Sequence, residues 1–267
     1  MKVKESERVI KEIEEKLACS LTAETIELVP FLPYLLQDLW ELGSNPRDMI
    51  RMIKRHMPIS ESTKILDLAC GKGAVSINIA KELGVKVYGF DLIPEFIEYS
   101  TQKAKELGVD ELCHFAVGEV NEVVDTEKNY DCVIFGAAGN ILGSPQETLT
   151  KLSKVVKPGG YIIIDEAYLP DDGSNEGVMY KNYDFLNHKQ WLDLFKNNSL
   201  KLVEELQNEE EYDFDSDNKA IATRANELIA KYPEKRAIFE GYIQSQLNEC
   251  TDLESNVIAV TWMLQRI

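Results

Sequence analysis

The sequence predicts a doubly wound α/β fold built around a mostly parallel sheet. Short segments that are apolar or β-branched, as strands are, occur at 64–68, 86–90, 114–117, 131–135 and 161–165. Helical patterns separate them at 74–83, 93–107 and 145–156. Strands that alternate with helices form a parallel sheet with helices on both faces. A glycine-rich turn directly after the first strand segment is also typical of this fold class.

Further helical patterns flank this alternation on its N-terminal side. Residues 2–18 have apolar side chains at helical spacing. Residues 22–57 should form several short helices, because prolines at 30, 33 and 46 interrupt a mainly apolar run. We therefore expect an N-terminal helical cap at 1–57.

The C-terminal part adds two strands and more helices. The elements expected there are a helix at 187–197, a strand at 200–206, an acidic loop at 209–215, helical stretches around 218–231 and 234–250, and a last strand at 256–265. The core then comprises 58–206 plus 251–267. Residues 207–250 form a helical insertion, which we expect to cover the site at the carboxyl ends of the strands.

Composition and charge exclude several classes of protein. The 267 residues include 29 Lys and Arg against 46 Asp and Glu, a net charge of −17. Such a surface repels phosphate backbones, so we expect no nucleic-acid partner. The sequence contains no run of about 18 apolar residues, which is what a helix needs to span a bilayer. The N-terminal residues lack the apolar region of a secretory signal. We expect a cytoplasmic protein with no membrane partner.

The cysteines and histidines do not suggest a metal centre. The five cysteines are odd in number, widely scattered and free of any C-x-x-C pair. This pattern argues against a disulfide framework and against a structural zinc site. The three histidines show no metal-ligand spacing either. We therefore expect reduced thiols and no bound metal.

The glycine turn carries the strongest functional signal. Gly71 and Gly73 lie between a buried strand and a helix, where glycine allows close approach of a ligand and the helix start favours an anionic group. Asp91, at the tip of the second strand segment, suits a ribose diol. A dinucleotide site uses a third glycine, but that position holds Ser76. This difference weakens the dinucleotide interpretation.

In these motifs the sequence resembles the class I S-adenosylmethionine-dependent methyltransferases. The resemblance rests on Asp67-Leu68-Ala69-Cys70-Gly71-Lys72-Gly73, on Asp91, and on the turn Lys157-Pro158-Gly159-Gly160, and it covers roughly residues 60–206 plus the last strand. It implies a Rossmann-like doubly wound sheet of seven strands, mostly parallel with the last strand antiparallel, together with helical cap elements. The implied cofactor is S-adenosylmethionine.

The resemblance also implies where the cofactor lies. The methionyl part would lie against Ala69, Cys70, Gly71 and Gly73, with Asp67 at the strand end. The ribose would bind Asp91, and the adenine would lie between Leu92 and Val120 with its amino group on Glu119, next to Gly118. The stretch from Phe135 to Asn140, which includes Gly136, would pass the methionyl chain and the sulfonium on the way to the acceptor.

Several of these residues also have plain structural interpretations. Asp91 alone could cap the helix that begins near Pro94, and Glu119 alone could be a solvated loop acid. His188, which follows the fifth strand segment, is a weak candidate for a catalytic base.

The acceptor side of the site is less defined. Tyr34 and Trp40 lie on the proline-broken helices and should line an enclosed acceptor pocket of roughly 300–1,000 Å³, with Asn140 and Tyr168 as polar contacts. In the competing interpretation, these helices and the insertion only extend the core or form a dimer contact.

We therefore expect a methyltransferase that acts on a small-molecule acceptor by direct displacement at the sulfonium methyl, as a monomer or homodimer. Because the donor is already activated, positioning should be the main catalytic contribution of the protein. Two alternatives remain open. One is a non-catalytic S-adenosylmethionine-binding or partner-binding protein. The other, less favoured because of Ser76, is an NAD(P)-dependent oxidoreductase.

Overall fold

The computed structural model describes residues 2–170, 177–180, 183, 185–207 and 213–267. The strands are β1 (Lys64–Leu68), β2 (Lys86–Asp91), β3 (Cys113–Val117), β4 (Tyr130–Phe135), β5 (Val156–Tyr168), β6 (Leu200–Gln207) and β7 (Ile258–Arg266). The helices are α1 (Lys2–Ser20), η1 (Ile26–Phe31), α2 (Leu32–Leu35), α3 (Pro46–His56), α4 (Ala74–Leu83), α5 (Pro94–Glu106), α6 (Val120–Thr126), α7 (Pro145–Val155), α8 (His188–Asn197), α9 (Phe214–Lys231), η2 (Pro233–Lys235) and α10 (Arg236–Ser255).

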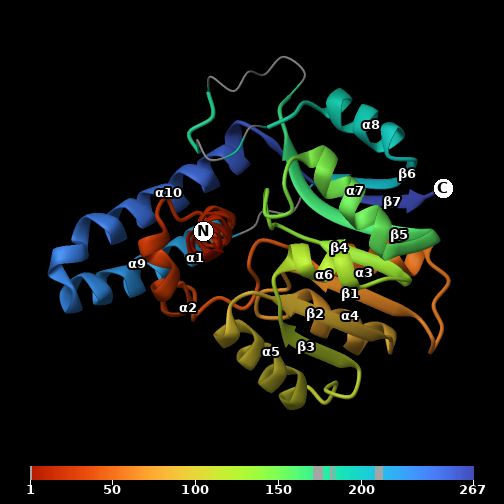
Figure 1. The fold of residues 1–267 in the computed structure, drawn as a ribbon, viewed down its shortest axis with the longest axis horizontal. Coiled ribbons are helices and arrows are strands. Elements are labelled where there is room, and N and C mark those ends of the chain that lie inside the picture. The colour runs from red at the N-terminus through yellow and green to blue at the C-terminus, as the bar shows by residue number, and fades with distance from the viewer. Residues whose placement is uncertain (1, 171–176, 181–182, 184, 208–212) are drawn as a thin grey trace.

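The strands form one twisted sheet in the order β3-β2-β1-β4-β5-β7-β6 (Figure 1). The first five strands pair in parallel. β7 lies antiparallel between β5 and β6. The predicted doubly wound sheet, with its antiparallel last strand, is thus confirmed.

Helices cover both faces of the sheet, as the alternating pattern predicts. One face packs against α3, α4 and α5 through apolar residues such as Ile53, Ile77 and Ala104. The other face packs against α6, α7 and α8, where Leu152 and Trp191 are buried. Both faces of the central strands are therefore apolar, which explains their near-continuous hydrophobic sequences.

Helix α3 differs from its expected role as the last part of the cap at 1–57. Its residues Met49, Met52 and Ile53 are fully buried in the same cluster as Ile65 of β1. Asn45 and Pro46 start this helix at a favourable N-cap and N1 position. The apolar stripe of α3 needs a partner surface and finds it on the sheet, so α3 packs on the core, while the bounds of the cap stay a prediction.

The remaining flanking helices form a separate layer beside the sheet. Figure 1 shows α9 and α10 running alongside each other at one side of the sheet, and α2 contacts α9. Their shared apolar cluster includes Leu28, Leu35, Leu228 and Phe239 and reaches Phe96 of α5. None of the helices in the described ranges is both long and apolar enough to cross a membrane.

Side-chain caps set several helix boundaries. Ser144 with Glu147, and Asn187 with Gln190, form capping boxes at the starts of α7 and α8. Asp213 accepts the Ser216 amide at the start of α9, so the end of the expected acidic loop at 209–215 is already helical. Residues 209–212 of that loop lie outside the described residues.

The assignment of α3 to the core makes a stability prediction. We expect Ile53→Ala to lower the free energy of unfolding by about 2–5 kcal/mol, because the fully buried side chain leaves a cavity. Urea denaturation followed by circular dichroism measures this loss. Val9→Ala, at an exposed position of α1, is the control and should change the free energy by less than about 0.5 kcal/mol. An equally small effect at Ile53 would contradict the assignment.

Candidate functional site

A cavity of about 70 Å³ lies at the carboxyl ends of β1, β2 and β4. Its walls come from α1, from the loops after these three strands, from the segment before α3 and from the starts of α5 and α6. The lining residues are Ile13, Lys16, Leu17, Ser20, Leu21, Leu42, Ala69, Gly71, Asp91, Leu92, Phe96, Glu119, Val120, Gly136, Ala137, Ala138 and Ile141. In open α/β sheets this edge is where ligands bind.

The loop after β1 has a strongly constrained backbone. Ala69, Gly71 and Gly73 all have positive φ angles, of 56°, 52° and 75°. A Cβ atom on Gly71 would lie 3.0 Å from the Leu42 side chain, and one on Gly73 would lie 2.9 Å from Ser100. Left-handed conformation and close packing therefore both require glycine at these two positions.

Asp91 connects this loop to the end of β2. Its carboxylate accepts the Gly71 amide at 2.8 Å and the Ile93 amide at 2.9 Å. Burial raises the pKa of Asp91, while these two amide bonds oppose the rise. Asp91 does not cap α5, whose N-cap residue is Ile93 and which has no side-chain cap bond. The same carboxylate lines the cavity, and its role in binding stays a prediction.

Asp67 lies beneath the glycine loop rather than in the cavity wall. Its Oδ2 accepts the Ser76 hydroxyl at 2.6 Å, and burial raises the pKa of Asp67 to about 7. Ser76, which replaces the third glycine of a dinucleotide motif, is itself fully buried. This position therefore serves an internal hydrogen bond to the first strand.

The predicted adenine side of the site is brought together at the start of α6. Glu119 caps this helix by accepting the Glu122 amide at 3.1 Å, and it also accepts the side-chain amide of Asn121 at 2.7 Å. Leu92, Glu119 and Val120 all line the cavity.

The end of β4 closes the cavity from the opposite side. A Cβ atom on Gly136 would overlap the Ser44 hydroxyl and lie 3.1 Å from Asp165. Gly43, with φ of 98°, would bring a Cβ atom to 2.8 Å from Ala137. The segment before α3 is thus packed directly on the residues that follow β4.

The cofactor residues predicted from the sequence divide into two groups. Those that line the cavity are Ala69, Gly71, Asp91, Leu92, Glu119, Val120 and Gly136. Those that do not line the cavity but lie in the strand ends and loops around it are Asp67, Cys70, Gly73 and Gly118. Burial raises the pKa of the Cys70 thiol well above its usual range. The Gly118 amide donates to the Asp91 carbonyl at 2.9 Å.

The predicted acceptor residues lie elsewhere and not in the wall of this cavity. Tyr34 donates to Glu227 of α9 at 2.5 Å. Trp40 packs against the core of the sheet and borders an open surface groove of about 950 Å³ beside α3 and α4. Asn140 is exposed in a turn, and Tyr168 is buried against Trp262 at 5.9 Å between ring centroids.

His188 is held in a structural cluster at the far side of β5. Its Nε2 lies 2.7 Å from Glu205 of β6, which also accepts the Trp262 indole N–H at 2.8 Å. The imidazole packs against Tyr168. His188 therefore contacts residues of the sheet edge and not the lining of the cavity.

Sequence reasoning missed the contribution of α1. Ile13, Lys16, Leu17, Ser20 and Leu21 all face the cavity. Their spacing of three and four residues is that of one helix face, so the signal was present in the sequence. The apolar positions of this stripe indicated a helix, but only the tertiary structure reveals what it covers.

Two carboxyl groups at the end of β5 were also missed. Burial raises the pKa of Asp165 to about 6 and that of Glu166 to about 7. Asp165 accepts the Thr261 hydroxyl at 2.5 Å, and Glu166 accepts the Tyr183 hydroxyl at 2.5 Å. The sequence signal was two consecutive acids directly after the apolar run of a parallel strand.

Comparison with known proteins gives the site a context. A family model described as a methyltransferase domain matches residues 59–226, which is more than half of the chain. YjhP of Escherichia coli K12, described as uncharacterized, is 32% identical over 117 residues, or 43% of this chain and 46% of that protein. A demethylmenaquinone methyltransferase of Bacillus mycoides is 32% identical over 135 residues, or 48% and 56%. The chain spans about half the length of these curated relatives.

Solved structures share the fold over most of the chain. A methyltransferase from Geobacter sulfurreducens, solved with S-adenosylhomocysteine, has a TM-score of 0.72 at 20% identity and covers 89% of this chain and 98% of its own. The crystal structure of YjhP has a TM-score of 0.71 at 21% identity and covers 88% and 100%. The agreement therefore extends beyond the strands to the flanking helices.

The buried carboxyl of Asp67 makes a pH prediction. Its pKa is about 7 in the folded protein against an ordinary 3.8, so the folded state retains a proton that the unfolded chain releases. This contribution to stability is complete below about pH 4 and is lost as the pH rises through about 7. At about 1.4 kcal/mol per pKa unit, the loss between about pH 5 and about pH 8 is about 2–3 kcal/mol.

We expect Asp67→Asn to remove that part of the pH dependence, because the amide stays neutral at both pH values. Urea denaturation at about pH 5 and about pH 8 measures the difference in unfolding free energy. Asp193→Asn, at an exposed position of α8, is the matched control and should retain the wild-type pH dependence. If Asp67→Asn retained it too, the pKa of Asp67 would not be raised in the folded protein.

Proposed function

Because this chain belongs to the family of methyltransferase domains, we propose that it transfers the methyl group of S-adenosylmethionine to a small-molecule acceptor. The observation that carries the proposal is the cavity at the glycine loop, where Asp91 and Glu119 face a space that is otherwise mainly apolar. This combination suits a nucleoside, which presents a diol, an amino group and a flat apolar ring.

The residues present fit such a cofactor by their chemistry. Each oxygen of Asp91 accepts one backbone amide and retains a second lone pair for a ribose hydroxyl. Leu92 and Val120 offer apolar surface for the adenine, and Glu119 offers an acceptor for its amino group. Ala69, Gly71 and Gly136 leave room for the methionyl chain because none has a side chain larger than a methyl group.

The cofactor needs more space than the cavity now provides. A volume of about 70 Å³ is well below the 300–1,000 Å³ typical of sites that enclose such ligands. We propose that α1 moves to admit the cofactor, because it supplies one wall of the cavity while Val9 and Ile10 on its outer side are exposed. The end of α1 is anchored by the Tyr180 hydroxyl, which donates to the Cys19 carbonyl at 2.9 Å.

The chemical contribution of the protein is mainly positioning. The sulfonium of S-adenosylmethionine supplies an activated methyl group, so the chain itself has to orient donor and acceptor and exclude water. The close packing of the segment before α3 on Ala137, together with α1, would enclose the reacting groups. We assign no catalytic base, since His188 contacts Glu205 and Tyr168 instead of the cavity.

A small-molecule acceptor is favoured by the enclosure of the site and by the relatives. α1 covers the cavity, and a layer of further helices packs beside α1. A large polymer would need an open face here, and the net charge of −17 disfavours nucleic acid in particular. The name of the Bacillus mycoides relative specifies a quinone acceptor, demethylmenaquinone. Tyr34, Trp40, Asn140 and Tyr168 remain predictions as acceptor contacts.

The two alternative functions make different demands on the site. The dinucleotide site of an NAD(P)-dependent oxidoreductase uses a third glycine for close helix–strand packing near the pyrophosphate, but this position holds Ser76, which is buried and hydrogen-bonds Asp67. A non-catalytic protein that binds S-adenosylmethionine would use the same cavity. Turnover with candidate acceptors is what separates this second alternative from the proposed function.

Cofactor choice tests the proposal directly. We expect S-adenosylhomocysteine and S-adenosylmethionine to bind more tightly than NAD, because Asp91 offers a ribose acceptor while Ser76 replaces the third glycine of a dinucleotide motif. Isothermal titration calorimetry of the purified protein with each ligand measures the three dissociation constants. Tighter binding of NAD than of S-adenosylhomocysteine would refute the methyltransferase proposal.

The role of Asp91 gives a second test. We expect Asp91→Ala to weaken S-adenosylhomocysteine binding at least tenfold, because hydrogen bonds to a charged group contribute about 1.5–3 kcal/mol each. Calorimetry gives the affinity, and a thermal unfolding curve shows that the variant is folded. The control Asp193→Ala removes an exposed carboxylate of α8. An unchanged dissociation constant for Asp91→Ala would restrict Asp91 to its structural bonds with the Gly71 and Ile93 amides.

A further inference from the structure

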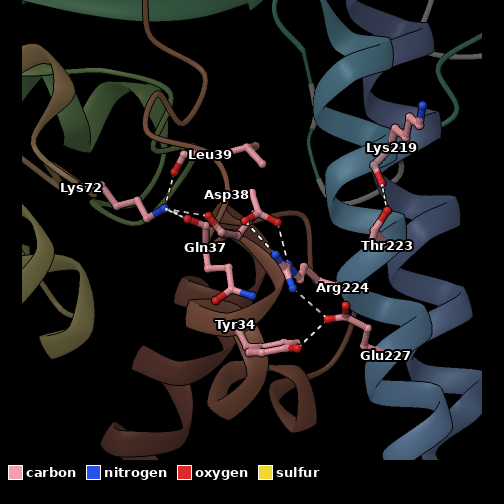
Figure 2. Close-up of polar contacts among 10 residues, drawn as sticks. Tyr34, Gln37, Asp38, Leu39, Lys72, Lys219, Thr223, Arg224 and Glu227 are labelled. Atoms are coloured by element: carbon pink, nitrogen blue, oxygen red, sulfur yellow. Dashed lines mark hydrogen bonds and ion pairs between the residues drawn. The ribbon is translucent and has the colours of Figure 1, made fainter.

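Lys72 lies inside the glycine loop, yet its side chain does not line the cavity. The residue is only 4% exposed, and its side chain reaches the residues that follow α2. We call residues 36–39, from Leu36 to Leu39, the cap turn. Figure 2 shows Lys72 approaching the cap turn from the side of the glycine loop.

The ammonium of Lys72 donates three hydrogen bonds to carbonyl groups of the cap turn. Its Nζ donates to the Leu36 carbonyl at 2.8 Å, to the Gln37 carbonyl at 2.9 Å, and also to the Leu39 carbonyl. The Tyr99 ring of α5 covers it at 4.8 Å from the ring centroid. Burial lowers the pKa of Lys72 to about 8, so the side chain remains charged at neutral pH.

A second set of contacts holds the cap turn from the opposite side. Asp38 accepts two bonds from Arg224 of α9, from Nε at 2.6 Å and from Nη2 at 3.0 Å. Arg224 also contacts Glu227 at 3.0 Å, and Glu227 accepts the Tyr34 hydroxyl at 2.5 Å. Figure 2 shows that the cap turn lies between α9 and the glycine loop and is hydrogen-bonded to both.

The position of the cap turn decides where the next residues lie. The chain continues into Leu42, which lines the cavity and packs on Gly71, and into Gly43, which packs on Ala137. The Trp40 indole N–H donates a hydrogen bond of 3.2 Å to the Lys72 carbonyl. Only a few residues separate the ammonium contacts from the cavity wall, so a shift of the cap turn would move that wall.

We propose that Lys72 is a positioning residue for the cofactor site: it fixes the cap turn over the glycine loop, and the Asp38–Arg224 pair couples α9 to the same turn. Side chains of α9 therefore influence cofactor affinity although none of them lines the cavity. This inference rests on the proposed function, because it predicts how tightly the cofactor binds.

The first test compares Lys72→Met with Lys81→Met, which removes an exposed lysine from α4. We expect Lys72→Met to weaken S-adenosylhomocysteine binding at least tenfold in calorimetry, and Lys81→Met to leave it unchanged. Hydrogen exchange without ligand should be faster at residues 36–44 in Lys72→Met alone. Wild-type affinity and wild-type exchange in Lys72→Met would overturn the proposal.

The second test uses the exposed side of the cap turn, where loss of folding is not expected. We expect Arg224→Gln and Asp38→Asn each to weaken binding about threefold, and Arg224→Gln to add no further loss to Lys72→Met. Effects that simply multiply in the double variant would show that α9 and Lys72 do not act through one turn. Should Lys72→Met fail to fold, unchanged affinity in both single variants at Asp38 and Arg224 would overturn the coupling.

These outcomes remain separate from those of the proposed function. If the wild-type protein bound no S-adenosylhomocysteine, the methyltransferase proposal would fail. The hydrogen exchange of residues 36–44 in the ligand-free variants would then decide whether Lys72 fixes the cap turn. Faster exchange in Lys72→Met supports that role, and unchanged exchange refutes it.

Discussion

The carboxylate of Asp91 is the interaction on which the geometry of the site depends. It accepts the amides of Gly71 and Ile93, and its own carbonyl accepts the Gly118 amide. One residue thereby joins the loop after β1, the start of α5 and the segment before α6. Buried amides need such acceptors, so the three segments around the cavity cannot shift independently. A ligand that engages Asp91 would act on all of them together.

The sequence predicted those features that depend on local patterns. β1 and α4 have the expected boundaries, because a short buried strand and a glycine turn leave few alternatives. Ala69, Asp91 and Glu119 meet in one cavity because parallel strands end at one edge of the sheet. Asp67 and Gly73 do not line the cavity, because the Asp67 side chain bonds Ser76 and Gly73 packs against Ser100, and the linear pattern does not contain these contacts.

Features that depend on long-range packing could not be predicted from the sequence. The amphipathic pattern of α3 is the same whether it packs in a cap or on the sheet, and only the partner surface decides between these positions. Lys72 is part of the glycine motif, but nothing in the linear pattern indicates that it bonds three carbonyl groups of the cap turn. Tyr34 lies on the expected flanking helix, but its hydroxyl turns toward Glu227, about two hundred residues away.

The placement of β7 has a consequence for how the chain acquires its fold. Among the described residues, β6 is an edge strand that pairs with β7 alone. β7 in turn pairs with β5 across a separation such as the 96 residues between Asp165 and Thr261. β6 therefore has no place in the sheet until the segment after α10 has inserted. Contacts of such high sequence separation form late and slowly. During synthesis β6 emerges before β7 and stays unpaired in that interval, and unpaired strand edges make a partly folded chain prone to aggregation.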